Sequence, residues 1–204
     1  MANDIFFPKG LTDVLNSPEF DDEAGILIES LIYNNDDLII TFSIRFDANN
    51  DTPQQLWQIN IVDIEDEKIT RSWVRNVEIL TEHVLLLEYN DIHTELYFNG
   101  TTNDSQQLFI DIFQCVTQLS NDNTNTIKYT LLPERIYELN RQGYGLFARG
   151  PKSILKIYEK CLLKAGIKSK FIGNYAPSKN NPLKLLKLGD SYFIYHDIQF
   201  KKIK

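Results

Sequence analysis

The sequence predicts an α+β fold: a mainly antiparallel meander sheet capped by an amphipathic helix, followed by a smaller C-terminal part of helices and strands. Short runs of aliphatic and aromatic residues recur between residues 26 and 100, separated by polar turn formers. From residue 104 onward, the apolar residues change from strand spacing to helical spacing. A chain of 204 residues with 43% hydrophobic content is also long enough to bury a core.

The first predicted elements are two strands joined by a polar turn. "ILIESLIY" (26–33) and "LIITFSIRF" (38–46) flank "NNDD", and Asn and Asp tolerate the left-handed backbone of a tight turn. "LWQINIVDI" (56–64) alternates apolar and polar residues as a half-buried strand does. A turn at "EDE" would then lead into the remaining predicted strands, at 68–80, 83–89 and 94–100.

An amphipathic helix is predicted next, at 104–120. Its apolar residues fall on one broad helical face: Leu108, Phe109, Ile112, Phe113, Val116 and Leu119. Asn103 or Asp104 can accept the free N–H groups of the first turn. We expect this helix to close over one face of the preceding sheet.

The remaining chain predicts two helices, at 134–142 and 151–165. Extended segments are predicted at 144–149, 168–173 and 192–200. The polar run 121–126 is typical of a linker. The predicted organisation is therefore an acidic lead-in (1–25), a sheet with its capping helix (26–120) and a basic α+β part (127–204) packed on the sheet.

Charge is distributed unevenly along the chain. The net charge is −7, but residues 1–125 carry 23 acidic and 5 basic residues, a balance of −18. Residues 126–204 carry 5 acidic and 16 basic residues, a balance of +11. Such asymmetry indicates either charged partners or docking of the two halves on each other, within one chain or between two copies.

The glycine-rich stretch "NRQGYGLFARGPKS" (140–153) could suggest a phosphate-binding loop. However, Gly143, Gly145 and Gly150 have the wrong spacing for a dinucleotide loop and follow a predicted helix instead of a strand. Gly143 suits a helix C-cap, and Pro151 suits the first turn of the next helix. We interpret the stretch as a helix end followed by a helix start, and a small nucleotide-binding enzyme is the weaker hypothesis.

The helix predicted after Pro151 carries a ridge of lysines at every fourth position, hereafter the lysine ridge: Lys152, Lys156, Lys160 and Lys164. Such a ridge can be a solvated face, a docking surface for an acidic protein or a nucleic-acid contact. Nucleic acid is the least favoured of these, because no aromatic residues are interleaved with the lysines and the whole chain is acidic.

Two dense acidic clusters stand out in the first half: Glu19, Asp21, Asp22 and Glu23, and then Asp63, Glu65, Asp66 and Glu67. Each can be a solvated turn, an anionic patch that faces a partner or a metal site. Neither has the glycine spacing of a calcium loop, so no metal or cofactor is expected.

No pattern in the chain predicts a catalytic centre. The three histidines lack metal-ligand spacing, and no serine lies in a G-x-S-x-G elbow. No enzyme activity is therefore expected. Cys115 and Cys161 have apolar neighbours, which indicates two reduced core thiols. With no signal peptide and no apolar run long enough to cross a bilayer, we expect a cytoplasmic protein without membrane contact.

Several segments in order carry a resemblance to a known class of proteins. They are "LWQINIVDI", "HVLLLEYNDIHTELYFNG" before an amphipathic helix, "GYGLFARGPKSILKIYEKCLLKAGI" and "LGDSYFIYHDIQF". In segment style and order, this resembles the small cytoplasmic immunity proteins of bacterial polymorphic toxin systems. The resemblance implies a protein that neutralises one cognate toxin, a contact-dependent or secretion-system effector, through a tight protein–protein interface.

The charge layout adds a mechanism to this hypothesis. Nucleases and other nucleotide-acting toxins tend to present basic clefts, which an acidic surface could occupy with electrostatically steered association. In this interpretation Asp63, Glu65, Asp66 and Glu67 pair with toxin Lys and Arg residues. Trp57 and Trp73 would supply apolar packing. The alternative is an adaptor or oligomerising module whose acidic and basic halves dock.

Overall fold

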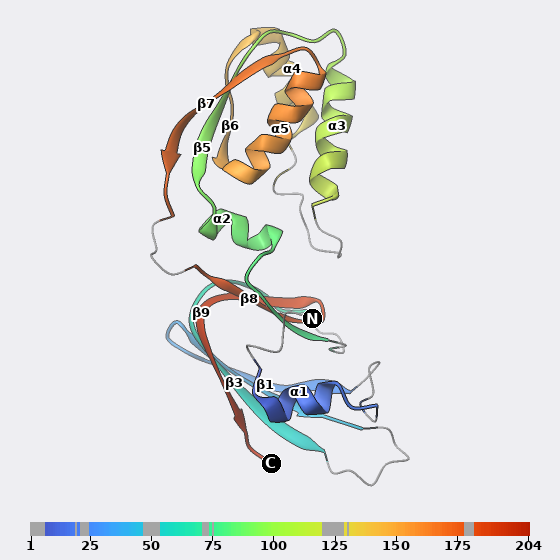
Figure 1. Cartoon of the computed structure of the whole chain (residues 1–204), viewed down its shortest axis with the longest axis vertical. Helices are drawn as coiled ribbons and strands as arrows, with labels where there is room; N and C mark the ends of the chain where they lie inside the picture. Colours follow the sequence, from blue (N-terminus) through green and yellow to red (C-terminus); the bar gives the residue numbers. More distant parts are fainter. Residues whose placement is uncertain are drawn as a thin grey trace. The chain divides into compact units, whose positions relative to one another are not determined.

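The computed structural model describes residues 7–18, 20, 25–46, 54–70, 74, 76–119, 129, 131–177 and 182–204. The chain divides into two compact units, Met1–Glu82 with Asn181–Lys204 (unit 1) and His83–Asn180 (unit 2). Every described strand pair in both units is antiparallel, and each unit combines its sheet with helix (Figure 1). The predicted α+β class with mainly antiparallel sheet is confirmed.

Unit 1 is built on a six-stranded sheet of order β1-β2-β3-β9-β8-β4. Its elements are α1 (Lys9–Leu15), β1 (Ile26–Asn34), β2 (Asp37–Ile44), β3 (Gln55–Lys68), β4 (Val77–Leu80), β8 (Lys184–Leu188) and β9 (Ser191–Lys202). Strand β9 lies between β3 and β8. The C-terminal segment therefore completes a sheet that the N-terminal strands begin.

Alternation along the central strands creates the core of unit 1. On β2 the side chains of Leu38, Ile40 and Phe42 are fully buried, while the residues between them lie on the opposite face. Strand β3 continues this pattern with Trp57, Ile59 and Ile61. Helix α1 adds Leu11 to the same core. Full burial of each such side chain contributes about 1.5–3 kcal/mol.

Unit 2 has a three-stranded sheet of order β6-β5-β7. Its elements are η2 (Val84–Leu86), α2 (Leu87–Asn90), β5 (His93–Asn99), α3 (Ser105–Thr117), α4 (Pro133–Gln142), β6 (Tyr144–Pro151), α5 (Lys152–Lys164) and β7 (Lys168–Tyr175). Helices α3, α4 and α5 lie on one side of this sheet, and their apolar faces share a core with Leu96, Phe98 and Phe147 (Figure 1).

Local signals place the ends of the unit 2 helices. The carboxylate of Asp104 accepts a hydrogen bond from the Gln107 N–H at 2.8 Å, which is the predicted N-cap of α3. Gly143 ends α4 in the left-handed conformation at φ 74°, as predicted. Among the helices in the described ranges, none has the length and apolar character needed to cross a bilayer.

Three predicted strand features are wrong. Residues 83–89 form η2 and α2, because Val84, Leu85 and Leu86 are buried in succession and do not alternate. The "EDE" turn lies within β3, which runs to Lys68. Of the strand predicted at 68–80, Val77–Leu80 pairs as β4, and residues 71–73 and 75 lie outside the described residues.

The division into units also differs from the predicted organisation. Helix α3 packs with α4 and α5 and shares a core with β5, all within unit 2. The predicted lead-in contains α1, which contributes to the unit 1 core. Strand β8 was not predicted. The place of β9 in unit 1 could not be read locally, because its pairing with β3 joins segments far apart in the sequence.

Candidate binding surfaces

The acidic run of Asp63, Glu65, Asp66 and Glu67 lies on β3, beside β9. A bulge interrupts the ladder here: Ile64 pairs with Tyr195 and Asp66 pairs with Ile194, which leaves Glu65 as the extra residue. Asp63 and Glu65 are exposed, whereas Asp66 and Glu67 are half-buried, so the run does not form one uniform surface.

Three of these carboxylates have partners within unit 1. Glu65 lies 3.7 Å from the His196 ring, and Asp66 accepts a 3.5 Å hydrogen bond from the Tyr192 hydroxyl. Glu67 accepts one of 2.6 Å from Tyr33. Burial, followed by this bond to Glu67, raises the pKa of Tyr33 to about 12. These three carboxylates therefore serve the fold as well as the surface charge.

Asp63 belongs to a different group of acids, which we call the acidic corner: Asp36, Asp37 and Asp63. The N–H of Asp63 donates to the Asp37 carboxylate at 3.2 Å, and the Ile64 N–H donates to the Asp36 carbonyl at 3.0 Å. Asp63 has φ 52°, a left-handed conformation that Asp tolerates better than most residues. Asp36 and Asp63 are exposed. The "NNDD" pattern predicts a hairpin turn, but it does not reveal that two of its residues join Asp63 in the surface charge.

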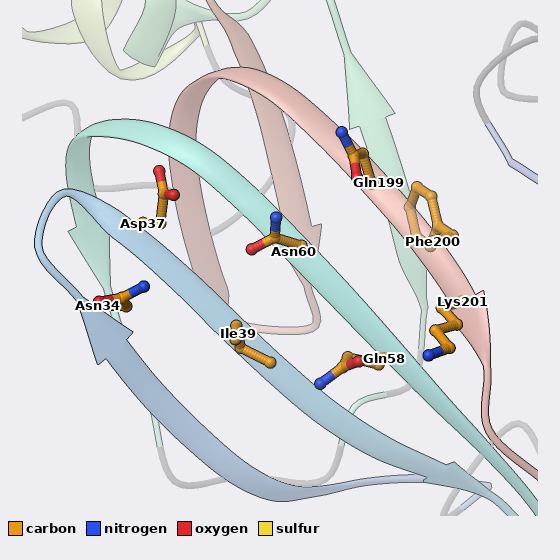
Figure 2. Close-up of a pocket in the computed structure, with 8 residues that line it drawn as sticks. All are labelled: Asn34, Asp37, Ile39, Gln58, Asn60, Gln199, Phe200 and Lys201. Atoms are coloured by element: carbon orange, nitrogen blue, oxygen red, sulfur yellow. The ribbon is translucent and has the colours of Figure 1, made fainter.

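A groove of about 550 Å³ lies beside the acidic corner, on the face of the sheet opposite the core (Figure 2). It is lined by Asn34, Asp37, Ile39, Gln58, Asn60, Gln199, Phe200 and Lys201. The strand register explains the grouping, because Asn60 pairs with Ile39 on one side and Gln199 on the other. We call it the amide groove.

The chemistry of the amide groove is that of a hydrogen-bonding surface. Its four carboxamides each offer two N–H donors and a carbonyl acceptor. Asp37 and Lys201 add one charge of each sign, and Ile39 adds an apolar patch. Such a lining suits the peptide groups and polar side chains of an inserted protein loop. The amide groove could not be predicted from the sequence, because its residues come from four strands and lie together only once those strands have paired.

The two tryptophans were predicted to pack against a toxin, and the structure describes only Trp57. Trp57 is 3% exposed and belongs to the core of unit 1, with the Lys202 ammonium 5.9 Å from its ring centroid. It cannot pack against a partner in this conformation, so that prediction is wrong. The alternation that identified the strand also places Trp57 on its inner face. Trp73 lies outside the described residues, as do Glu19, Asp21, Asp22 and Glu23.

The lysine ridge lies on α5 of unit 2, and its members have different surroundings. Lys164 forms a 2.9 Å ion pair with Asp111 of α3, and Lys152 donates to the Asn174 side chain at 3.2 Å. Lys156 and Lys160 are exposed. The two ends of the ridge therefore fasten α5 to neighbouring elements, and its middle is a solvated face.

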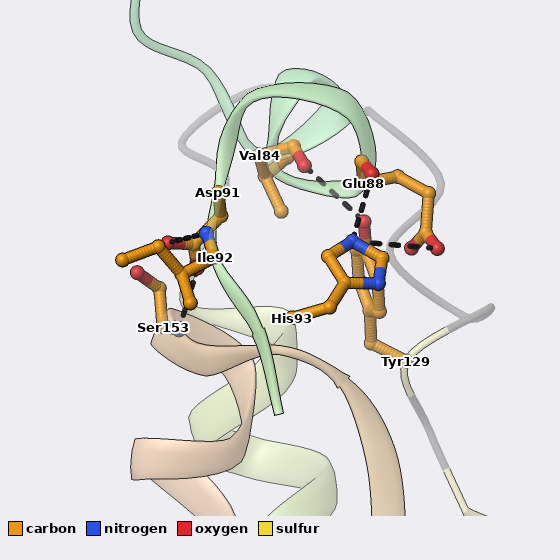
Figure 3. A network of polar contacts seen from close by, with 7 residues as sticks. All are labelled: Val84, Glu88, Asp91, Ile92, His93, Tyr129 and Ser153. Carbon is orange, nitrogen blue, oxygen red and sulfur yellow. Dashed lines mark hydrogen bonds and ion pairs between the residues drawn. The ribbon is translucent and has the colours of Figure 1, made fainter. Parts of the chain in front are cut away.

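Polar contacts at the start of β5 hold the N-terminus of α5 (Figure 3). One oxygen of Asp91 accepts from the Ser153 N–H at 2.7 Å and the other from the Ile92 N–H at 2.8 Å. The Lys152 N–H donates to the Ile92 carbonyl. Pro151 provides no side-chain cap, so Asp91 supplies from a distant segment the anion that a helix N-terminus favours.

This arrangement bears on the glycine-rich stretch before α5. A phosphate bound there would need the free N–H groups of the first turn of α5. The Lys152 and Ser153 N–H groups already donate within unit 2, to Ile92 and Asp91. The prediction of a helix end at Gly143 and a helix start near Pro151 agrees with the structure, except that Pro151 is the N-cap and not the first helical residue.

The histidine nearest this network also has local partners. His93 Nε2 lies 2.8 Å from the Glu88 carbonyl and 3.9 Å from its carboxylate. Within the described ranges, no three His, Cys, Asp or Glu side chains are grouped as metal ligands would be. Compared with protein families, curated proteins and solved structures, the chain shows no match.

Proposed function

We propose that this protein is a cytoplasmic, non-enzymatic immunity protein that neutralises a cognate bacterial toxin by binding it through unit 1. The observation that carries the proposal is the acidic corner beside the amide groove. Asp37 belongs to both, so charge and hydrogen-bonding groups are continuous on this surface.

The acidic corner would act mainly during the approach of the partner. Unit 1 carries 19 acidic and 10 basic residues, a net charge of −9, whereas unit 2 carries 9 acidic and 11 basic residues, a net charge of +2. A partner with a basic cleft would be attracted to unit 1, and exposed acids at its surface raise association rates more than final affinity. A basic cleft of this kind is the property expected of a nuclease or other nucleotide-acting toxin.

The amide groove would then fix the orientation of the bound toxin. The paired strands fix the backbone positions of these carboxamides, so that binding has to order only their side chains. A toxin loop that enters the groove can exchange its bonds to water for bonds to these amides. The acids of the corner would thus attract the toxin, and the amides of the groove would hold it.

The experiment is co-expression with the product of the neighbouring open reading frame, followed by titration of the purified proteins. Asp36→Asn with Asp63→Asn removes two charges, and Asn tolerates the left-handed backbone of position 63 as well as Asp does. Asp13→Asn with Asp190→Asn removes the same charge elsewhere in unit 1 and serves as the matched control.

We expect wild-type protein to restore growth and to co-purify with the toxin. At low salt, the corner variant should associate about 5-fold more slowly than wild type. The association rate of the control variant should fall by less than half as much. The proposal fails if wild-type protein neither restores growth nor binds the neighbouring product. Equal slowing by both variants would show that net charge, and not the acidic corner, attracts the partner.

A further inference from the structure

The three-stranded sheet of unit 2 has a face that its helices leave open. Leu96 and Phe98 of β5 point into the core shared with α3, α4 and α5, so Glu95 and Tyr97 point to the other side. Register places cross-strand neighbours on that side in rows: Leu146–Tyr97–Lys170 and Arg149–Glu95–Ile172. Tyr144, Lys168 and Tyr175 continue the same face.

Tyrosine rings are distributed across all three strands of this open face. Tyr144 on β6 is 73% exposed and Tyr175 on β7 is 56% exposed. Tyr97 on the central strand donates a 3.1 Å hydrogen bond to Glu95. The ring of Tyr175 lies against Gly173, where a Cβ atom would come within 2.8 Å of it. The rings of Tyr97 and Tyr175 are thus held in place by neighbouring residues.

Cationic groups alternate with these rings. Lys168 and Lys170 are exposed on β7, and the Arg149 side chain on β6 is 67% exposed. The one carboxylate on this part of the face, Glu95, is 8% exposed and accepts hydrogen bonds from Arg149 and Tyr97. Arg149 pairs with it through Nη2 and stays largely exposed, so three cations outnumber the one carboxylate on this surface.

We propose that this open face binds single-stranded nucleic acid. Tyr97, Tyr144 and Tyr175 would stack on bases, and Arg149, Lys168 and Lys170 would contact phosphates. Rings flanked by cations on an exposed sheet are the arrangement by which proteins hold single strands without reading their sequence. The lysine ridge lacks the rings, so the sequence argument against nucleic acid there does not apply to this face.

An acidic protein segment is the competing occupant, and the rings decide between the two. An acidic peptide would be attracted by the cations but would gain little from three separate tyrosine rings. A polynucleotide uses both groups, because every base has a face on which an aromatic ring can stack. This inference concerns unit 2 and does not depend on the function proposed for unit 1.

The test uses the full-length protein and fluorescein-labelled 12-mers of dT and rU, with binding measured by fluorescence anisotropy. We expect dissociation constants in the range of about 1–100 μM near physiological salt. Three phosphate contacts predict that log affinity falls with log salt with a slope of about −2. Absence of binding at 50 mM salt with 100 μM protein would overturn the proposal.

Variants then locate the site. Tyr144→Ala and Tyr175→Ala should each weaken binding about 5-fold or more. Lys168→Glu with Lys170→Glu should weaken it more than 10-fold and flatten the salt dependence. The matched controls are Tyr137→Ala, at an exposed tyrosine on α4, and Lys156→Glu with Lys160→Glu on α5.

The controls should bind within about twofold of wild type, and circular dichroism should show that all variants are folded. Equal losses in the controls would place binding elsewhere and overturn the proposal. The proposal would also be overturned by two results together. Poly-glutamate at equal charge would displace the 12-mer, and both tyrosine variants would bind the 12-mer as tightly as wild type does. That outcome would identify an acidic protein segment as the occupant.

Discussion

The two units of this protein use the chain in different ways. Unit 2 is one continuous stretch, and its core joins three helices to a sheet of three strands. Unit 1 takes its strands from both ends of the chain, with β9 inserted between β3 and β8. In sequence terms, unit 2 is an insertion between β4 and β8 of unit 1.

This difference has consequences for folding and for charge. Unit 1 must close a loop from Lys68 to Tyr192 before β9 can pair, and prior folding of unit 2 within that loop would help by shortening it. The closure also brings the basic C-terminal strands into the acidic sheet, with Lys201 and Lys202 on β9 beside β3. The charge asymmetry along the sequence is therefore partly cancelled within unit 1.

The largest expected effect comes from removing residues 181–204. Deletion takes away β8 and β9, which exposes the core edge of β3 and leaves β4 without its partner. We expect unit 1 to unfold completely while unit 2 remains folded. Two-dimensional NMR of the truncated chain should retain dispersed amide signals only for residues of unit 2.

The reciprocal fragment, residues 83–180, should fold alone, because unit 2 has its own core. A cooperative thermal transition in this fragment is the expected result. If the fragment lacks one while the full chain shows it, the two units are not independent folding units.

The next effect concerns the two thiols of unit 2, which the sequence predicted to be reduced core thiols. Cys161 is buried, but Cys115 is exposed, so that prediction is wrong for Cys115. Burial, followed by the neighbouring Cys115, raises the pKa of Cys161 to about 12. At pH 8 we expect Cys115 to react with iodoacetamide at least 100-fold faster than Cys161.

Mass spectrometry of the digested, alkylated protein measures both rates. Deleting residues 181–204 should leave the slow rate of Cys161 unchanged, since its surroundings belong to unit 2. Rapid labelling of Cys161 in that variant would show that unit 2 depends on unit 1.

A smaller effect is expected at Asp91, which caps α5 from outside the helix. Asp91→Ala leaves the Ser153 and Ile92 N–H groups without their acceptor and should lower the free energy of unfolding of unit 2 by about 1–2 kcal/mol. Asp91→Asn keeps an acceptor and should lose less. Denaturant unfolding of the 83–180 fragment measures both, with Asp104→Ala, which removes the local cap of α3, as the comparison.

The smallest effect is the pH dependence of the Asp111–Lys164 pair between α3 and α5. Hydrogen bonds from Lys164 and then Gln107 lower the pKa of Asp111 below its ordinary value. Its stabilising contribution is therefore present above about pH 4 and is lost as pH falls through the lowered pKa. Asp111→Asn should lower the melting temperature of unit 2 by a few degrees at most at pH 7, and this difference should shrink as pH falls through the lowered pKa.

High salt provides the control for this last prediction. The Lys164 side chain is 68% exposed, so 1 M NaCl should weaken the pair at pH 7 and reduce the difference between wild type and variant. A difference that stays constant from pH 7 to pH 2 would mean that Asp111 stabilises the helices without its charge.

Much of the candidate surface could not be predicted from the sequence. Asp63 was identified by its place in an acidic run, but its neighbours Asp36 and Asp37 come from a hairpin turn. The amide groove combines four strands, and the residues on it are common polar types that form no motif. Tyr144 and Tyr175 lie on separate edge strands, so only the register of β5 reveals that they share a face.

The sequence by itself determined the local elements of this protein: the alternating strands, the Asp104 cap of α3 and the left-handed Gly143 that ends α4. These features depend on neighbouring residues, for which spacing and side-chain type are sufficient. Only the tertiary structure decided that β9 lies beside β3, that Asp91 caps α5 and that unit 1 spans both chain ends. Each of these is a contact between distant segments, and many pairings satisfy the same local pattern until the whole core selects one.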